Sequence, residues 1–158
     1  MSELEVPDPE TRLAGLGYAL PENLFVGGLY VPAVRAGDLV FTSGAVPVRD
    51  GALTHAGKVG AEVSLEQAQA AARIAVVNAL ASVRAETGSL RRVMRVVRLV
   101  GYVASAPGFT DQPGVMNAAS QLLIEAFGDS GRCARTAVGV AELPLGVPVE
   151  VDLVVLLR

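Results

Sequence analysis

The stretch GRCARTAVGVAELPLGVPVEVD, residues 131–152, contains two predicted strands and one charged residue near the start of each. The apolar run that follows Arg135 predicts one strand, and the alternating run Val149–Leu157 predicts another. Alternate residues of the second strand share one face, so Glu150 and Asp152 fall together on the other. If the connection makes the two strands a hairpin, Arg135 and Glu150 lie at the same end of a sheet. We therefore expect a small site with one cation and one acid.

The rest of the chain alternates between strand and helix signals. Ser64 and Gln67 fit a capping box, which predicts a helix start, and Gly88 is a typical helix stop. The predicted elements are a turn at 36–38 into a strand at 39–43, a loop or small hairpin at 48–60, a helix at 65–88, a strand at 95–105 and a helix at 115–127. This pattern favours an α+β fold of order β-β-(β)-α-β-α-β-β, with one mixed sheet and two helices packed on the same face.

Length and composition fit one compact domain. The chain has 158 residues, of which 51% are hydrophobic and 4% aromatic. We expect an N-terminal extension at 1–22, which includes a short helical turn from Pro9 to Leu16, and a single domain at 23–158. The aliphatic composition, with a mean hydropathy of +0.45, favours an oligomer with a buried interface.

Charge and cysteine content narrow the possible partners. The net charge of −3 argues against a broad nucleic-acid-binding face. The chain holds one cysteine, Cys133, and one histidine, His55, so a His- or Cys-rich metal site is not expected. No uninterrupted apolar run is long enough to span a bilayer, and the N-terminus lacks the layout of a signal peptide. We expect no cofactor, no membrane partner and a cytoplasmic location.

Several pieces of the chain, in the right order, resemble one protein family. At the C-terminal end they are Ala134-Arg135-Thr136-Ala137-Val138, Leu143-Pro144 and Val149-Glu150-Val151. Upstream they are Tyr30-Val31-Pro32-Ala33-Val34, Gly37, the run Leu39–Gly44 and Val115-Met116-Asn117. Together they resemble the YjgF or Rid family of reactive intermediate deaminases, which has also carried the label endoribonuclease L-PSP.

The resemblance implies a chorismate-mutase-like fold assembled as a homotrimer, with sites in clefts between subunits. It also implies hydrolysis of reactive enamines and imines, such as 2-aminoacrylate, to 2-keto acids and ammonia. Arg135 would hold the substrate carboxylate, and Glu150 would position or activate the attacking water. The pocket would be lined or supported by Tyr30, Ser43, Gly44, Asn117 and the backbone of Ala137. The expected partners are a small carboxylate substrate and other copies of the chain.

The chain also departs from the family pattern. Many deaminating members carry a cysteine two residues after the arginine, where this chain has Ala137, and Pro32 stands where glutamine is common. The loop at 106–114 is longer than in compact members. These differences favour a divergent subgroup with its own substrate preference.

Two other functions are also compatible with the sequence. The chain could bind or sense a small carboxylate without turning it over, in which case Glu150 would only pair with Arg135. It could also cleave RNA or inhibit translation, a role against which the acidic composition and the scarcity of stacking aromatic residues argue.

Overall fold

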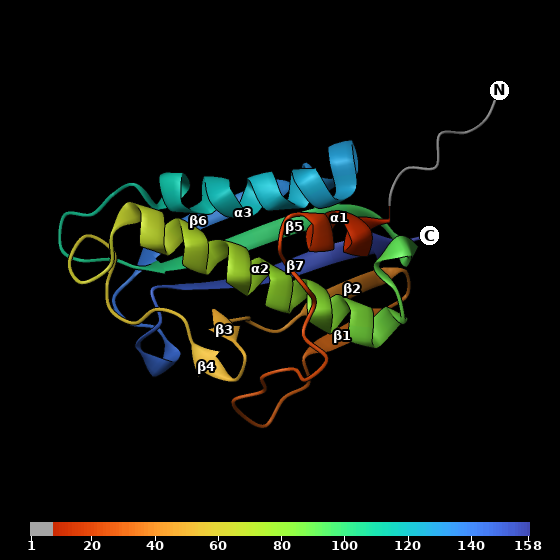
Figure 1. Ribbon diagram of the computed structural model, residues 1–158, viewed down its shortest axis with the longest axis horizontal. Coiled ribbons are helices and arrows are strands. Elements are labelled where there is room, and N and C mark those ends of the chain that lie inside the picture. Colours follow the sequence, from red (N-terminus) through yellow and green to blue (C-terminus); the bar gives the residue numbers. More distant parts are fainter. Residues whose placement is uncertain (1–7) are drawn as a thin grey trace.

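The computed structural model describes residues 8–158 of the chain. Its strands are β1 (Ala33–Ala36), β2 (Leu39–Thr42), β3 (Val48–Arg49), β4 (Ala52–Leu53), β5 (Val93–Ala104), β6 (Ala134–Val140) and β7 (Val149–Leu157). Its helices are α1 (Pro9–Gly15), α2 (Leu65–Thr87) and α3 (Gln112–Phe127). One five-stranded sheet has the order β1-β2-β7-β5-β6, and α2 and α3 cover the same face of it (Figure 1). The predicted α+β architecture is therefore confirmed.

The two short hairpins follow the turn signals of the sequence. Gly37, with a positive φ of 62°, lies in the turn that joins β1 to β2, and these strands pair antiparallel. Asp50 and Gly51 form the turn between β3 and β4, also with positive φ angles of 53° and 77°. Asparagine, aspartate and glycine tolerate such angles at low cost, which explains why turns form at these positions.

Both main helices begin with a side-chain cap. The Ser64 hydroxyl accepts a hydrogen bond from the Gln67 amide at 3.1 Å, and the Gln67 side chain accepts one from the Ser64 amide at 2.9 Å, so the predicted capping box is present. Gly88 ends α2 in a left-handed conformation. The next helix, α3, begins at Gln112 rather than at Val115, because the Asp111 carboxylate accepts from a first-turn amide.

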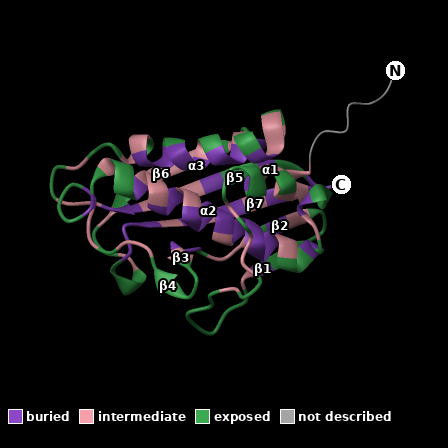
Figure 2. Ribbon diagram, in the orientation of Figure 1, coloured by how far each residue is buried: buried purple, intermediate pink, exposed green. Residues whose placement is uncertain are grey.

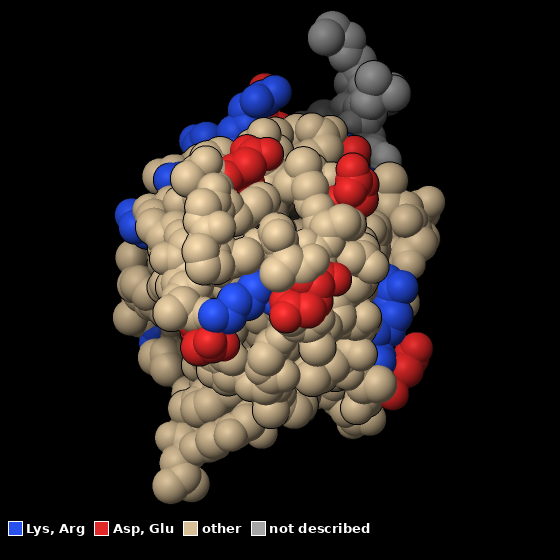
Figure 3. All heavy atoms as spheres, turned by 90° about the vertical axis from the view of Figure 1, so that its left-hand side faces the viewer, with Lys and Arg blue, Asp and Glu red and all other residues tan. Residues whose placement is uncertain are grey.

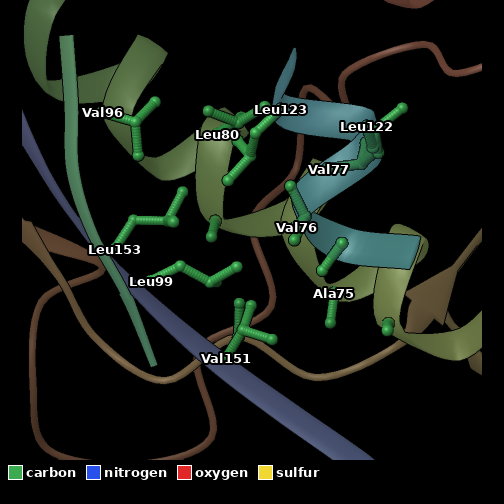
Figure 4. Close-up of a cluster of buried hydrophobic side chains, with 14 of the residues drawn as sticks. Ala75, Val76, Val77, Leu80, Val96, Leu99, Leu122, Leu123, Val151 and Leu153 are labelled. Atoms are coloured by element: carbon green, nitrogen blue, oxygen red, sulfur yellow. The ribbon is translucent and has the colours of Figure 1, made fainter. Parts of the chain in front are cut away.

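The core lies between the helices and the sheet. The strand β7 runs through the buried centre of the molecule (Figure 2). Its alternate residues from Val149 to Leu157 are buried, while Glu150 and Asp152 point to the opposite, open face and are partly buried. Leu99 and Leu153 from the sheet meet side chains of α2 and α3, among them Val76, Leu80, Leu122 and Leu123 (Figure 4). Each fully buried side chain of this size contributes about 1.5–3 kcal/mol of transfer free energy.

One arrangement of the strands that the sequence allowed is not formed. The sequence left open a hairpin of β6 and β7 as the way to bring their charged residues together, but β5 lies between them, parallel to β6 and antiparallel to β7. The physical reason is the crossover through α3, which returns the chain to the same end of the sheet and so makes β6 parallel to β5. Arg135 and Glu150 are consequently two strands apart.

The first described helix packs against the domain. The expected helical turn from Pro9 is present as α1, and its Leu13 side chain is fully buried in the core. The Glu10 carboxylate accepts a hydrogen bond from the Leu90 amide at 3.0 Å, which ties α1 to the start of β5. Within residues 8–158, no helix combines the length and the apolar character that a bilayer span requires.

Candidate functional site

Arg135 lies on β6 and faces the helices. Its register partner on β5 is Leu99, a core residue, and paired residues of neighbouring strands point to the same side of a sheet. Guanidinium nitrogen Nη1 donates to Asn117 Oδ1 at 2.8 Å and to Ser120 Oγ at 3.1 Å, both on α3. Within residues 8–158 the guanidinium makes no other hydrogen bond, so the edge formed by its other nitrogens can receive a ligand.

Ala137 lies two residues further along β6 on the same face. Its register partner is Gly101, and its side chain packs against the core. The structure therefore brings three of the predicted positions, Arg135, Asn117 and Ala137, to one place between β6 and α3. Sequence reasoning missed Ser120, although its position three residues after Asn117 puts both on one side of a helix.

Glu150 lies on the open face of the sheet, next to the end of β2. Its register partner on β5 is Tyr102. A Cβ atom built on Gly44 would collide with the Glu150 carboxylate, so a larger residue there would displace this side chain. This contact places two of the predicted site residues, Gly44 and Glu150, together.

A groove begins at the same β2 end. Ser43 Oγ donates to the Val31 carbonyl at 2.6 Å, and the Tyr30 hydroxyl accepts from the Gly27 amide at 3.0 Å, so the segment before β1 is fixed against the strand. Tyr30, Ser43 and Gly44 line a groove of about 850 Å³ that continues toward α2 and the segment after α1. Glu150 does not line this groove, so of these three positions only Gly44 is in direct proximity to Glu150.

The candidate site of one chain is therefore divided into two halves. Arg135, Asn117 and Ala137 lie on the helix-facing side of the sheet, and Glu150 with Gly44 lies on the open side. Because β5 lies between β6 and β7, no hairpin of these two strands brings Arg135 and Glu150 together. A small ligand can touch both only in a cleft formed by more than one copy.

The two acids of the open face, Glu150 and Asp152, both have pKa values shifted by their surroundings. Burial raises the pKa of Glu150, and the negative charge of Asp152 raises it further. Burial also raises the pKa of Asp152, against the opposing effects of the Tyr102 hydroxyl and of Arg98. A carboxyl group with a raised pKa exchanges protons closer to neutral pH, which suits acid–base chemistry.

The sole cysteine lies on the other half, beside Arg135. Cys133 is partly buried, and burial raises the pKa of its thiol, while Arg135 opposes that effect. Among residues 8–158 no three His, Cys, Asp or Glu side chains gather closely enough to hold a metal ion.

The architecture and these charged positions define a small α+β protein with a mixed sheet and an arginine and a glutamate on its two faces. The sequence model of the family described as "YjgF/chorismate_mutase-like, putative endoribonuclease" matches residues 10–157. The chain therefore belongs to the YjgF/chorismate-mutase-like family, and the chorismate-mutase-like fold expected from the resemblance is confirmed.

Several relatives have similar sequences along most of their length. "Protein TCP17" of Trypanosoma cruzi is 42% identical over 145 residues, which is 91% of each protein. The crystal structure of Atu1372 from Agrobacterium tumefaciens, a protein described as having unknown function, is 42% identical with a TM-score of 0.88 and covers 95% of this chain and 92% of its own. A structure from Shewanella oneidensis, titled a "putative endoribonuclease", is 33% identical with a TM-score of 0.91 and covers 95% of this chain and 99% of its own.

Proposed function

We propose that the protein hydrolyses enamines and 2-imino acids, such as 2-aminoacrylate, to 2-keto acids and ammonia in clefts between the subunits of a homotrimer. Each cleft takes Arg135 from one copy and Glu150 from its neighbour. The proposal rests on the way the Arg135 guanidinium is held. Its Nη1 donates to two side chains of α3, and within residues 8–158 its other nitrogens are free to donate to a ligand. A planar guanidinium with a free edge can grip a carboxylate through two parallel hydrogen bonds.

The open face of the sheet supports self-association. Val34, Phe41 and Val138 point to this face by their register and are exposed by 53%, 43% and 39% in the single chain. An exposed apolar area on a folded chain usually marks an interface, and closed symmetric assembly covers it in every copy. Glu150 lies on this same face, so an interface there would place it beside a second copy.

The reaction needs few groups. Arg135 holds the substrate carboxylate, and Glu150, as a carboxylate, accepts a proton as the water oxygen bonds to the imine carbon. That proton passes to the imine nitrogen, which gives an intermediate with a hydroxyl and an amino group on one carbon. The hydroxyl proton then passes to the amino group through Glu150, the carbon–nitrogen bond breaks, and ammonia leaves as the carbonyl forms. An enamine first takes up a proton at its terminal carbon and loses one from nitrogen, which converts it to the imine. The sum is one 2-imino acid and one water giving one 2-keto acid and one ammonia. Because an imine is already electrophilic, orientation and one acid–base group can supply the required rate enhancement.

The test is the release of 2-keto acid from imines generated in situ by an amino-acid oxidase. We expect acceleration by the wild-type protein, a loss of about 10- to 100-fold for Arg135→Ala, and a loss of about 100-fold or more for Glu150→Gln. Arg132→Ala is the matched control, because this arginine is exposed and, within residues 8–158, its side chain pairs only with Asp129, at 3.3 Å. No acceleration by a folded, trimeric protein would contradict the proposal.

A carboxylate-binding protein without turnover is the second candidate, because Arg135 is oriented by α3 independently of Glu150. In that case Glu150→Gln leaves the affinity for pyruvate, measured by calorimetry, close to that of the wild type, and neither protein accelerates imine hydrolysis.

The family's description as an endoribonuclease makes RNA cleavage a third outcome to measure. On the face shown in Figure 3, acidic and basic side chains are few and interspersed, and the net charge is −3. Binding to single-stranded RNA that weakens steeply with salt would be the sign of such a function.

A further inference from the structure

A tyrosine and a second acid lie next to Glu150 on the open face. Val100 and Tyr102 of β5 are the register partners of Asp152 and Glu150, so the two acids and the tyrosine share one side of the sheet. The Tyr102 hydroxyl reaches diagonally across the strands to Asp152 Oδ2 at 3.1 Å. The hydrogen bond joins β5 to the central strand, β7, beside the proposed reacting carboxyl group.

The direction of this hydrogen bond follows from the chemistry of its partners. Burial raises the pKa of Tyr102, and the hydrogen bond with Asp152 raises it further, so the phenol keeps its proton at neutral pH. Tyr102 therefore donates and the Asp152 carboxylate accepts. Arg98 lies on the same strand as Tyr102, and its Nη2 donates to Thr136 Oγ1 at 3.0 Å. Its positive charge also favours the ionised form of Asp152.

We propose that Asp152, fixed by Tyr102, is a positioning residue for Glu150 and keeps a negative charge beside the reacting carboxyl group. The inference deepens the proposed imine hydrolysis and, for its effect on turnover, rests on it. A fixed carboxylate two residues away on the same strand face repels a second negative charge. It thereby makes Glu150 a better proton acceptor, and its anchoring to Tyr102 prevents it from turning away.

Within a single copy, Asp152 is the charged residue that perturbs Glu150. In the proposed cleft the neighbouring copy adds Arg135, whose positive charge acts on the pKa of Glu150 in the opposite direction. From β7 Glu150 faces Asp152, from β5 it faces Tyr102, with Arg98 further along that strand, and from the end of β2 it meets the uncharged Gly44. Removing the Asp152 charge removes a repulsion, so the pKa of Glu150 must fall. Removing the Tyr102 hydroxyl makes Asp152 easier to protonate, which weakens the same repulsion. The pKa of Glu150 should therefore fall in Tyr102→Phe as well, but by less.

The first test measures Glu150 directly in the assembled protein. Carboxyl ¹³C NMR of protein labelled at Glu and Asp, with the Glu150 signal assigned by its loss in Glu150→Gln, gives its titration midpoint. We expect a lower midpoint in Asp152→Asn, a smaller decrease in Tyr102→Phe, and a midpoint near that of wild type in Asp152→Glu, which retains the charge. Asp38→Asn is the matched control, because its side chain is 72% exposed in a distant turn. An unchanged midpoint in both Asp152→Asn and Tyr102→Phe would overturn the proposal.

The second test follows turnover. In the pH profile of kcat/KM, the limb that belongs to Glu150 should move to lower pH in Asp152→Asn and stay in place in Asp38→Asn. Tyr102→Phe should lower kcat about 2- to 10-fold, the effect of one hydrogen bond, with KM little changed. A shifted NMR midpoint in a protein without any imine turnover would support the pairing and reject the proposed reaction. Imine turnover in which Asp152→Asn shifts neither the Glu150 midpoint nor the limb of the pH profile would support the proposed reaction and reject the role of Asp152.

Discussion

Arg135 and Glu150 lie on opposite faces of one sheet, with β5 between their strands. The backbone of the sheet lies between the two side chains, so we do not expect one small substrate to touch both residues of one copy. If both act on one substrate, each cleft must combine Arg135 of one copy with Glu150 of another. This requirement has a direct consequence for mixtures of variants.

Mixing Arg135→Ala chains with Glu150→Gln chains should restore activity that neither variant has alone. In a closed three-membered ring, every mixed trimer contains one cleft with both residues intact, so random mixing gives about a quarter of the wild-type rate. The measurement is keto-acid release after co-refolding equal amounts of the two variants. A mixture of Arg135→Ala with Asn117→Ala is the control: both changes fall on the same half of the cleft, so the intact Arg135 of one chain lacks its Asn117 support. A co-refolded trimer without recovered activity would contradict the division of the site.

Gly44→Ala should impair the site without unfolding the protein. The added methyl group would collide with the Glu150 carboxylate, which must then leave its position. Since general acid–base groups contribute about 100- to 10,000-fold, displacing one should lower kcat/KM at least about tenfold. Gly15→Ala is the control, because a Cβ at that position of α1 meets no atom within 4 Å. Activity at the wild-type level in a folded Gly44→Ala protein would argue against a role for Glu150.

Ser120→Ala should weaken the binding of carboxylate ligands. Its hydroxyl accepts from Arg135 Nη1 at 3.1 Å, and without it the guanidinium is held by Asn117 alone. We expect KM to rise about 3- to 10-fold, with kcat less affected, because the interaction is formed in both ground and transition states. Gln121→Ala is the matched control on α3, because among the described residues this exposed side chain bonds only to Glu125. Equal KM values for both variants would show that Ser120 does not position Arg135.

The features that the sequence predicted well depend on neighbours along the chain. The capping box of Ser64 and Gln67, the turn at Gly37 and the helix stop at Gly88 each involve residues within four positions of one another. The alternation along β7 likewise needs only the period of a strand, and it correctly separated Glu150 from the core. Local rules therefore sufficed for the elements and for the face on which each side chain lies.

The features that the sequence did not predict depend on strand order. A short connection between two strands favours a hairpin, but β5 offers apolar pairing on both of its edges and lies between them. The contacts of Ser120 with Arg135 and of Tyr102 with Asp152 follow only once β5 and α3 are placed. No spacing along the chain contains that information, since these partners are 15 and 50 residues apart.

Cys133 should be an unreactive thiol at neutral pH. Burial raises its pKa above the ordinary value for a thiol, and the cation of Arg135 only partly opposes this effect. Because the thiolate is the nucleophile, a raised pKa leaves less of it at a given pH, so iodoacetamide should modify Cys133 more slowly than N-acetylcysteine at pH 7.5. Arg135→Ala removes a charge that favours the thiolate, so the pH midpoint of alkylation should rise further. A midpoint below that of N-acetylcysteine would instead indicate an activated thiol and would make Cys133 a candidate for the cysteine that other members carry at the position of Ala137.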